Sequence, residues 1–352
     1  MAALDWRSVP TSFGRIEYLD RGTGPVVLVI HGITQAADGG LRDVAEELVP
    51  DGYRLIVPSR FGYLGSHMPE QATPELQADA FVGLLDALEV NDAVVVAASA
   101  GSTSALHLAI GHPERVRALV LVSANVPGAH QLKGMPPKLV FKAIFGSDPI
   151  LWTMITYLPA LIARLSQVLV VPDGVLLEPG DDEKVSRAMR NVLLGRRRVV
   201  GEVFDAYISN PNVNRIDLSR VLVPTLVMHA RDDPGPPYAS AVEMSRRIPD
   251  ARLLTVETGG HMMLGAHADA IEEVARFIKA HSASIVDAQP GTGRGTAVAS
   301  DSITAARATV RAAQMRADNG RGGGRRRTRT RASTITEPVG PTTTGLRSIS
   351  AT

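Results

Sequence analysis

The sequence predicts an α/β protein with a mostly parallel central sheet and helices on both faces of that sheet. Two observations support this fold class. Short apolar runs alternate with helical patterns before about residue 125, and the same alternation returns after about residue 220. Between these two stretches the pattern is helical only. Alternating strand and helix units favour parallel strands covered on both sides, and the interruption indicates an insertion between two halves of one sheet.

Apolar runs define most of the strands that we expect, and an alternating pattern typical of an exposed strand defines 14–20. The run "PVVLVIHG" is continuous rather than alternating, which is typical of a strand buried on both faces. Thr73 followed by Pro74 predicts the start of a helix. The expected strands cover 14–20, 25–32, 53–59, 92–99, 117–124, 223–230 and 251–257. The expected helices cover 41–49, 74–90, 101–113, 136–146, 148–171, 181–210, 238–248 and 264–282.

These patterns divide the chain into three parts. Residues 1–124 and 220–282 form the predicted core, and residues 125–219 form a helical cap over the carboxyl edge of the sheet. Residues 283–352 are low in apolar residues and rich in Gly, Thr and Arg, so we expect a disordered tail. The apolar stretch 150–171 contains Pro159 and Arg164, and we interpret it as a buried or lid helix rather than a membrane span.

Composition limits the possible functions. The chain has 352 residues, of which 45% are hydrophobic and 21% charged, as in globular proteins. The absence of Cys excludes disulfides, thiolate metal sites and a cysteine nucleophile. The net charge is +1, but residues 282–352 hold 11 Arg and four acids, so the body carries −6. This acidic body indicates no specific nucleic-acid partner, and without a secretory pattern at the N-terminus we expect a cytoplasmic protein.

A serine lies where one expected strand turns into a helix. In "VVVAASAGSTSAL", Ser99 has Ala97 two residues before it and Gly101 two residues after it. A sharp strand-to-helix turn brings neighbouring backbones close together, so only small side chains fit at these positions. The usual form of this turn is G-x-S-x-G, and here Ala97 replaces the first Gly. Ser99 is therefore a candidate nucleophile.

A serine hydroxyl needs a base, and the base needs an acid that orients it. His261 directly follows the expected strand 251–257 and has Gly259 and Gly260 before it. Asp232 and Asp233 directly follow the expected strand 223–230. Because the carboxyl ends of parallel strands meet at one edge of a sheet, we expect His261 and one of these aspartates to lie beside Ser99.

Acyl transfer also needs donors for the negative charge on a carbonyl oxygen. The Ala100 N–H lies at the start of the helix after Ser99, where the helix dipole helps. A second donor is expected from the loop after "VVLVIHG", in which His31 and Gly32 lead to Ile33. We expect His31 to support this loop by hydrogen bonding rather than to act as an acid or a base.

The chain resembles the α/β-hydrolase fold superfamily, in its serine-nucleophile branch with a helical cap. The resemblance covers roughly residues 14–280 and implies Ser99 as nucleophile, His261 as base and Asp233 as acid, since Asp233 precedes Pro234 in the family's D-P pattern. It also implies Ile33 and Ala100 as the oxyanion hole. Ala97 and Ala230 depart from the family's usual glycines. The matching segments are "PVVLVIHG", "RFGYLGS", "VVVAASAGSTSALHLAIGHPERVRALVLVSA", "VPTLVMHARDDPGPP" and "TGGHMML".

A serine nucleophile of this kind forms an acyl-enzyme. We expect a hydrolase of a small hydrophobic carboxylic ester; the alternatives are a C–C-bond hydrolase, a lactonase, a cofactor-free perhydrolase or a non-catalytic ligand-binding protein on the same fold. No metal-ligand spacing or nucleotide-binding glycine motif is present, so we expect no metal and no cofactor. The oligomeric state is left open. Apolar cap residues are candidates for the pocket lining, namely Leu139, Phe141, Ile144, Phe145, Leu151, Trp152, Ile155, Tyr157 and Leu158.

Overall fold

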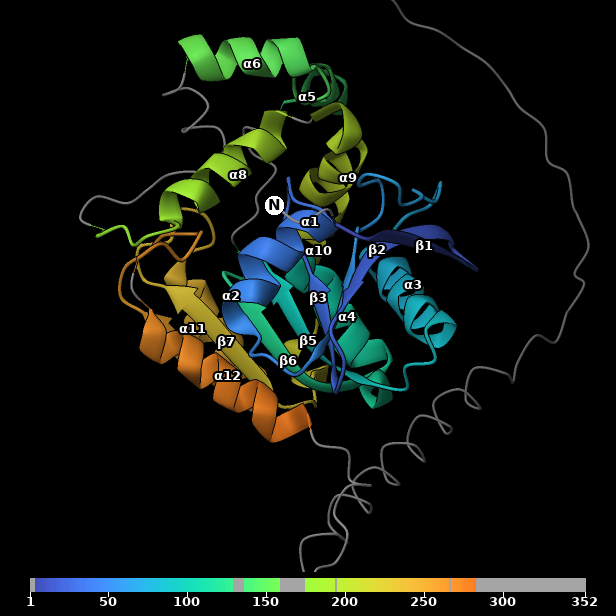
Figure 1. The fold of residues 1–352 in the computed structure, drawn as a ribbon, viewed down its shortest axis with the longest axis vertical. Coiled ribbons are helices and arrows are strands. Elements are labelled where there is room, and N and C mark those ends of the chain that lie inside the picture. Colours follow the sequence, from blue (N-terminus) through green and yellow to red (C-terminus); the bar gives the residue numbers. More distant parts are fainter. Residues whose placement is uncertain (1–3, 129–135, 159–174, 194, 266, 283–352) are drawn as a thin grey trace, which may run out of the picture. The chain divides into compact units, whose positions relative to one another are not determined.

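The computed structural model describes residues 4–128, 136–158, 175–193, 195–265 and 267–282. The chain divides into two units, 1–288 and 289–352. All described residues belong to the first unit, which is shown in Figure 1. The predicted tail, 283–352, lies outside the described residues.

Eight strands form one sheet within the described residues, in the order β1-β2-β4-β3-β5-β6-β7-β8. The pairs from β4 to β8 are all parallel, whereas β1 pairs with β2, and β2 with β4, in antiparallel fashion. The predicted mostly parallel sheet is thereby confirmed. The strands are β1 (Trp6–Thr11), β2 (Gly14–Arg21), β3 (Val26–Ile30), β4 (Arg54–Pro58), β5 (Ala93–Ala98), β6 (Val116–Val122), β7 (Thr225–Ala230) and β8 (Ala251–Val256).

The first strand is the one that the sequence patterns missed. β1 lies at the edge of the sheet, and its first three residues are exposed, so it carries no apolar run. It also contains Pro10, which has no backbone N–H and is tolerated in edge strands. A strand that buries little apolar surface leaves little periodic signal in its sequence.

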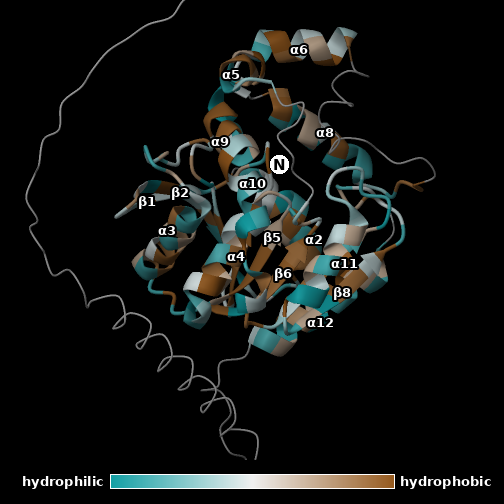
Figure 2. Ribbon diagram, turned by 180° about the vertical axis from the view of Figure 1, so that it is seen from behind, coloured by the Kyte–Doolittle hydropathy of each residue, from teal (hydrophilic) through white to brown (hydrophobic). Residues whose placement is uncertain are grey.

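Successive residues of β5 point to opposite faces of the sheet and join two separate cores. Val95 and Ala97 belong to one apolar cluster, and Val94 and Val96 belong to the other. The first cluster includes side chains of helices α3 (Pro74–Ala87), α4 (Gly101–Gly111) and α11 (Tyr238–Arg247). The second includes side chains of η1 (Leu41–Ala45), α2 (Glu46–Leu48) and α12 (Ala268–Ser282). Figure 2 shows the central strands as hydrophobic, in agreement with the continuous apolar runs that predicted them.

Thr73 begins α3 as predicted, because its hydroxyl accepts a hydrogen bond from the backbone N–H of Leu76 at 3.1 Å. The helices and helical turns of the core are α1 (Ala37–Gly40), η1 (Leu41–Ala45), α2 (Glu46–Leu48), α3 (Pro74–Ala87), α4 (Gly101–Gly111), η2 (Pro113–Arg115), α11 (Tyr238–Arg247) and α12 (Ala268–Ser282).

The segment between β6 and β7 is helical in its described part, but it is more broken than predicted. In its described part, the helix expected over 181–210 is divided into an α-helix that extends to Leu193, a 3-10 turn at Gly195–Arg197 and short helical pieces from Val199. Residues 159–171 of the expected helix 148–171 lie outside the described residues. The elements are α5 (Lys138–Phe145), α6 (Asp148–Tyr157), α8 (Asp181–Leu193), η3 (Gly195–Arg197), α9 (Val199–Phe204), η4 (Asp205–Ser209), α10 (Asn210–Asn212), η5 (Val213–Arg215) and η6 (Leu218–Arg220).

Figure 1 shows α5, α6, α8 and α9 gathered on the side of the unit opposite to α12. No single helix in the described part of the chain is long and apolar enough to cross a membrane. Helices α5 and α6 pass that test only as a pair, and they meet at a bend of 79°.

The start of α4 packs directly against the end of β3. A Cβ atom on Gly101 would lie 2.5 Å from the His31 carbonyl oxygen and 2.8 Å from that of Ile30. Because both neighbours are backbone atoms, they cannot yield as a flexible side chain could. Only glycine allows this approach, which explains the small residue that the serine turn has at this position.

We expect Gly101→Ala to lower the free energy of unfolding by about 1–3 kcal/mol, as for an overpacked core position. Gly111→Ala is the matched control, since Gly111 ends the same helix and an added Cβ there meets nothing within 4 Å. Urea unfolding of both variants measures the difference. Equal stability of the two variants would contradict the close approach of α4 to β3.

Candidate active site

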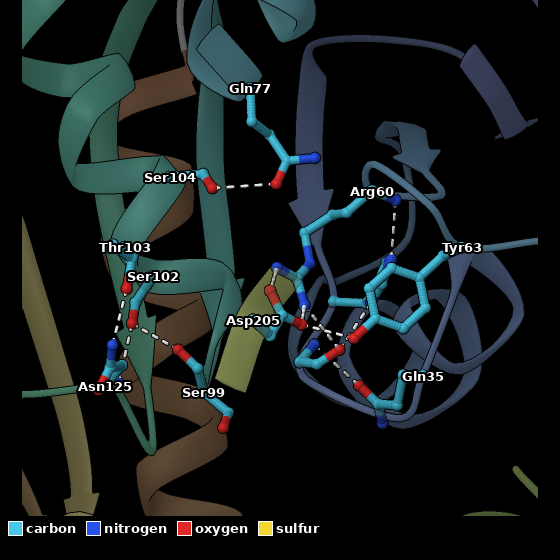
Figure 3. Close-up of polar contacts among 12 residues, drawn as sticks. Gln35, Arg60, Tyr63, Gln77, Ser99, Ser102, Thr103, Ser104, Asn125 and Asp205 are labelled. Atoms are coloured by element: carbon cyan, nitrogen blue, oxygen red, sulfur yellow. Dashed lines mark hydrogen bonds and ion pairs between the residues drawn. The ribbon is translucent and has the colours of Figure 1, made fainter. Parts of the chain in front are cut away.

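Ser99 occupies a strained turn between β5 and α4. Its φ angle is +48°, in the left-handed region that residues with a Cβ rarely adopt. Its N–H donates to the Val122 carbonyl at 2.9 Å. Its carbonyl oxygen accepts from the Ser102 N–H at 3.0 Å, from the Ser102 hydroxyl at 2.5 Å and from the Asn125 N–H at 3.1 Å (Figure 3). These contacts hold the turn in a conformation that the local sequence alone disfavours.

The structure brings Ser99, His261 and Asp233 together in one hydrogen-bonded chain. The Ser99 Oγ lies 2.9 Å from His261 Nε2. On the other side of the ring, His261 Nδ1 lies 2.9 Å and 3.1 Å from the two carboxylate oxygens of Asp233. The side chains of His261 and Asp233 are buried. An arrangement of this kind can move a proton from a serine hydroxyl to an imidazole whose orientation a buried carboxylate fixes.

Asp232, the other aspartate after β7, has a different set of partners. Its carboxylate accepts the backbone N–H groups of Gly259 at 3.0 Å and Gly260 at 2.9 Å. Asp232 therefore holds the loop that carries His261 but does not contact the imidazole. The geometry supports Asp233 over Asp232 as the partner of His261.

Two further residues, Ser123 and His229, fix the loops that carry His261 and Asp233. The sequence patterns did not indicate a role for either of them. Ser123, at the end of β6, donates its hydroxyl to the His261 carbonyl at 2.8 Å. His229 is fully buried, and its Nε2 lies 2.9 Å from the Pro236 carbonyl and 3.4 Å from Asp233 Oδ2. Burial lowers the pKa of His229, so the ring is neutral and its Nε2 acts as the donor.

The loop after β3 lies beside Ser99, as predicted. A Cβ on Gly32 would be 3.1 Å from the Ser99 Cβ, so this glycine permits a close approach. His31 Nδ1 lies 2.7 Å from the Gly32 carbonyl, and its Nε2 accepts the Arg60 N–H at 3.0 Å. Burial, together with the nearby Arg60 charge, lowers the pKa of His31 well below its ordinary value. The neutral ring thus supports the loop by hydrogen bonding, whereas the donor roles of the Ile33 and Ala100 N–H groups stay predictions.

A cavity of about 90 Å³ opens beside Ser99. We expected nine apolar residues, in α5, in α6 and at Leu158, to line a pocket. None of them is among the described residues that line this cavity. The segment between β6 and β7 contributes Lys184 and Ala188, both from α8. The other lining residues come from the core and are Gly32, Ile33, Thr34, Gln35, Asp43, Val44, Glu47, Leu48, Ala98, Ser99, Val122, Ser123, Met228, His261, Met262 and Met263.

Helix α8 reaches the cavity through two ion pairs with the core. Lys184 Nζ lies 2.6 Å from Glu47, and Arg187 Nε lies 2.8 Å from Asp43. Both acids line the cavity, so these pairs hold α8 at its wall. Among the described residues, no group of three or more His, Cys, Asp or Glu side chains could hold a metal ion.

The serine lies on a strained turn after a central parallel strand. It is hydrogen-bonded to a histidine, which is hydrogen-bonded in turn to an aspartate, and both follow later strands. This arrangement defines the α/β-hydrolase class of proteins. The chain belongs to this family: the model of the alpha/beta hydrolase fold matches residues 25–268.

The chain is similar to proteins that are named as hydrolases. The chain is 27% identical over 268 residues to the 2-hydroxy-6-oxo-6-phenylhexa-2,4-dienoate hydrolase of Burkholderia cepacia, covering 74% of this chain and 89% of that protein. It is 27% identical to the 2-hydroxy-6-oxononadienedioate/2-hydroxy-6-oxononatrienedioate hydrolase of Paraburkholderia xenovorans, covering 76% and 91%. A solved alpha/beta hydrolase fold protein from Nakamurella multipartita is 27% identical, with a TM-score of 0.56 and coverages of 79% and 99%.

Glu202, on α9, is a buried acid whose ionisation opposes folding. Burial raises its pKa from an ordinary 4.5 to about 8. The unfolded chain therefore loses a proton between about pH 4.5 and about pH 8 that the folded chain keeps. Stability contributed by this group is present below that window and falls as the pH rises through it.

We expect Glu202→Gln to remove this part of the pH dependence. The melting temperature of the variant should rise relative to that of the wild type between pH 5 and pH 8.5, as measured by thermal unfolding. The exposed Glu70 offers a control, Glu70→Gln, for a change of glutamate to glutamine on the surface. A constant difference between Glu202→Gln and the wild type across this pH range would contradict the buried, protonated carboxyl.

Proposed function

We propose that the protein is a serine hydrolase that cleaves a small substrate at a carbonyl carbon through an acyl-enzyme. The observation that carries this proposal is the continuous hydrogen-bonded chain from Ser99 through His261 to Asp233. Ser99 Oγ attacks the carbonyl carbon, and its proton passes to His261 Nε2. The N–H groups of Ile33 and Ala100 stabilise the resulting oxyanion.

The tetrahedral intermediate then collapses. The bond between the former carbonyl carbon and the leaving group breaks, and the leaving atom takes the proton from His261. Water, deprotonated by His261, next attacks the acyl-serine ester. This second collapse releases a carboxylic acid and returns the proton to Ser99 Oγ, so that atoms and charges balance over the cycle.

We infer that the bond cleaved is a C–C bond next to a ketone. The sequence patterns favoured a carboxylic ester and left the C–C bond as an alternative. The substrate named for the Burkholderia cepacia relative is a hydroxy-oxo-dienoate. That molecule has a ketone and a carboxylate but no ester, amide or lactone linkage, so its hydrolysis must break a C–C bond. The identity of 27% supports this preference over the ester.

We propose that Lys184 pairs with the carboxylate of such a substrate, in a cavity whose lining also includes the acids Asp43 and Glu47. Lys184 is the one Lys or Arg among the described residues that line the cavity. Its Nζ forms an ion pair with Glu47, so a substrate carboxylate would have to bind beside Glu47 or replace it as the partner of Lys184. The apolar side chains of Val44, Leu48 and Met263 suit the hydrocarbon part of such a substrate. We propose that residues 125–219 act as the cap that brings Lys184 to this position.

We expect the wild type to hydrolyse 2-hydroxy-6-oxo-6-phenylhexa-2,4-dienoate faster than p-nitrophenyl acetate or butyrate at equal concentration. Ser99→Ala should lower both rates by about 10³-fold or more. Loss of dienoate absorbance and release of p-nitrophenol measure the two reactions. Faster turnover of the esters would restore the ester interpretation. Activity that survives in Ser99→Ala would reject Ser99 as nucleophile, and inactivity towards every substrate would favour a ligand-binding role.

The two neighbouring aspartates allow a matched test of the acid. Asp233→Asn should lower kcat by about 10³- to 10⁴-fold, because an amide stabilises neither the imidazolium nor the required tautomer. Asp232→Asn should cost less than about 10-fold, since Asp232 acts on the Gly259 and Gly260 backbone rather than on the ring. Steady-state rates of the two variants decide between them. Equal losses would contradict the assignment of Asp233.

A further inference from the structure

We infer that Asp205, on η4 of the proposed cap, is a positioning residue for the oxyanion hole, acting through Arg60 on the Gly32 carbonyl. This inference rests on the proposed function, because it concerns how Ile33 N–H is held for its role. Asp205 and Arg60 are 145 residues apart in the sequence. Figure 3 shows their side chains facing each other next to the loop that follows β3.

The Gly32–Ile33 peptide is the group on which this network acts. The Gly32 carbonyl oxygen accepts from His31 Nδ1 at 2.7 Å and from Arg60 Nη2 at 3.1 Å. The Gly32 N–H donates to the Gln35 side chain at 3.1 Å. The Gly32 carbonyl and the Ile33 N–H belong to the same planar peptide, so two donors on the oxygen fix the direction of the N–H. They also polarise the peptide, which makes that N–H a stronger donor.

Asp205 pairs with the Arg60 guanidinium where both side chains are buried, and the pair fixes the direction of the Arg60 donors. Its Nη1 and Nη2 donate to the two Asp205 oxygens at 2.6 Å and 2.5 Å, and both side chains are fully buried. Tyr63 also donates its hydroxyl to Asp205, at 2.5 Å. Burial alone would lower the pKa of Arg60, but Asp205 raises it above its ordinary value. Asp205 therefore balances the charge of the buried guanidinium and holds it in position beside Gly32.

The segment that carries Asp205 is attached by its backbone to the loop after β4, which carries Arg60. The Gly201 N–H donates to the Gly62 carbonyl at 3.1 Å, and the Leu64 N–H donates to the Arg197 carbonyl at 3.0 Å. A Cβ on Gly201 would lie 2.2 Å from the Tyr63 ring, so α9 meets this loop at its closest possible distance. Correct seating of this segment thus places Asp205 against Arg60 and, through Arg60, sets the Gly32–Ile33 peptide.

The test uses the full chain and compares Asp205→Asn with Asp20→Asn. Asp20 forms a similar bidentate pair with Arg54, at 3.0 Å and 2.8 Å, between β2 and β4 and without contact to the site. The two readouts are the steady-state constants and the affinity for phenylboronic acid, which forms a tetrahedral, negatively charged adduct with a nucleophilic serine. Only the adduct and the transition state place charge at the oxyanion hole.

We expect Asp205→Asn to lower kcat by about 10- to 100-fold and to weaken phenylboronic acid binding by a similar factor, with KM within about 2-fold of the wild type. Asp20→Asn should leave all three values unchanged. A rise in KM with kcat and boronate affinity retained would overturn the inference, since that pattern indicates a role in substrate binding alone. Unchanged constants in Asp205→Asn would overturn it as well.

A second variant covers the case in which Asp205→Asn does not fold, because it leaves the buried Arg60 charge unpaired. The double variant Arg60→Met/Asp205→Leu removes both charges together and also removes the Arg60 donor from Gly32. We expect it to fold and to show the same losses in kcat and boronate affinity. Wild-type values in this variant would reject the inference.

The proposed function fails separately. If phenylboronic acid binds Ser99→Ala as tightly as it binds the wild type, the error lies in the choice of nucleophile and not in Asp205. If binding depends on Ser99 but is equal in the wild type and both Asp205 variants, the nucleophile stands and the positioning role of Asp205 is wrong.

Discussion

The close approach of α4 to the end of β3 is the constraint on which the rest of the site depends. Gly101 lies against the backbone carbonyls of Ile30 and His31, and this contact sets where β5 must end and α4 must begin. Ser99 has to make the turn in between, which forces its φ angle to +48°. The strain is balanced by backbone and hydroxyl donors on the Ser99 carbonyl. The same contact puts the loop after β3 beside the serine, where an oxyanion hole is needed.

The site is assembled from loops at several strand ends, and each loop is held by a polar contact to a neighbouring one. Asn125 donates to the Ser99 carbonyl, and Ser123 donates to the His261 carbonyl. Asp232 accepts two backbone N–H groups from the loop before His261. Loops of this kind carry little stabilising apolar surface of their own, so side chains from adjacent loops define their geometry. A catalytic arrangement that requires sub-ångström positions benefits from this mutual support.

The segment between β6 and β7 packs apolar side chains such as Phe204 and Val213 into the core, and it also makes several ion pairs with the core. Lys184 pairs with Glu47, Arg187 with Asp43, and Arg198 with Asp38. In these three pairs the segment supplies the cation. In the fourth pair the segment supplies the acid, Asp205, and the core supplies Arg60. Three of these four contacts lie at or near the cavity or the loop after β3, so the segment is connected to the site by directional bonds. Directional contacts specify one seating of the segment more sharply than apolar packing alone.

Local sequence patterns determined most of the strands of this protein and two of its candidate site residues. Buried parallel strands appear as apolar runs, and the antiparallel strand β2 appears as an alternating pattern. Seven of the eight described strands, and Ser99 and His261 after two of them, therefore follow from local patterns. The exposed strand β1 did not, because it buries too little apolar surface to leave a pattern. Asp232 and Asp233 were equivalent by position after β7. The family resemblance implied Asp233, and the fold shows that the Asp233 carboxylate faces the imidazole whereas that of Asp232 does not. The Arg60–Asp205 pair was likewise decided by tertiary structure, because two isolated charges 145 residues apart become partners only where the folded chain buries both of them.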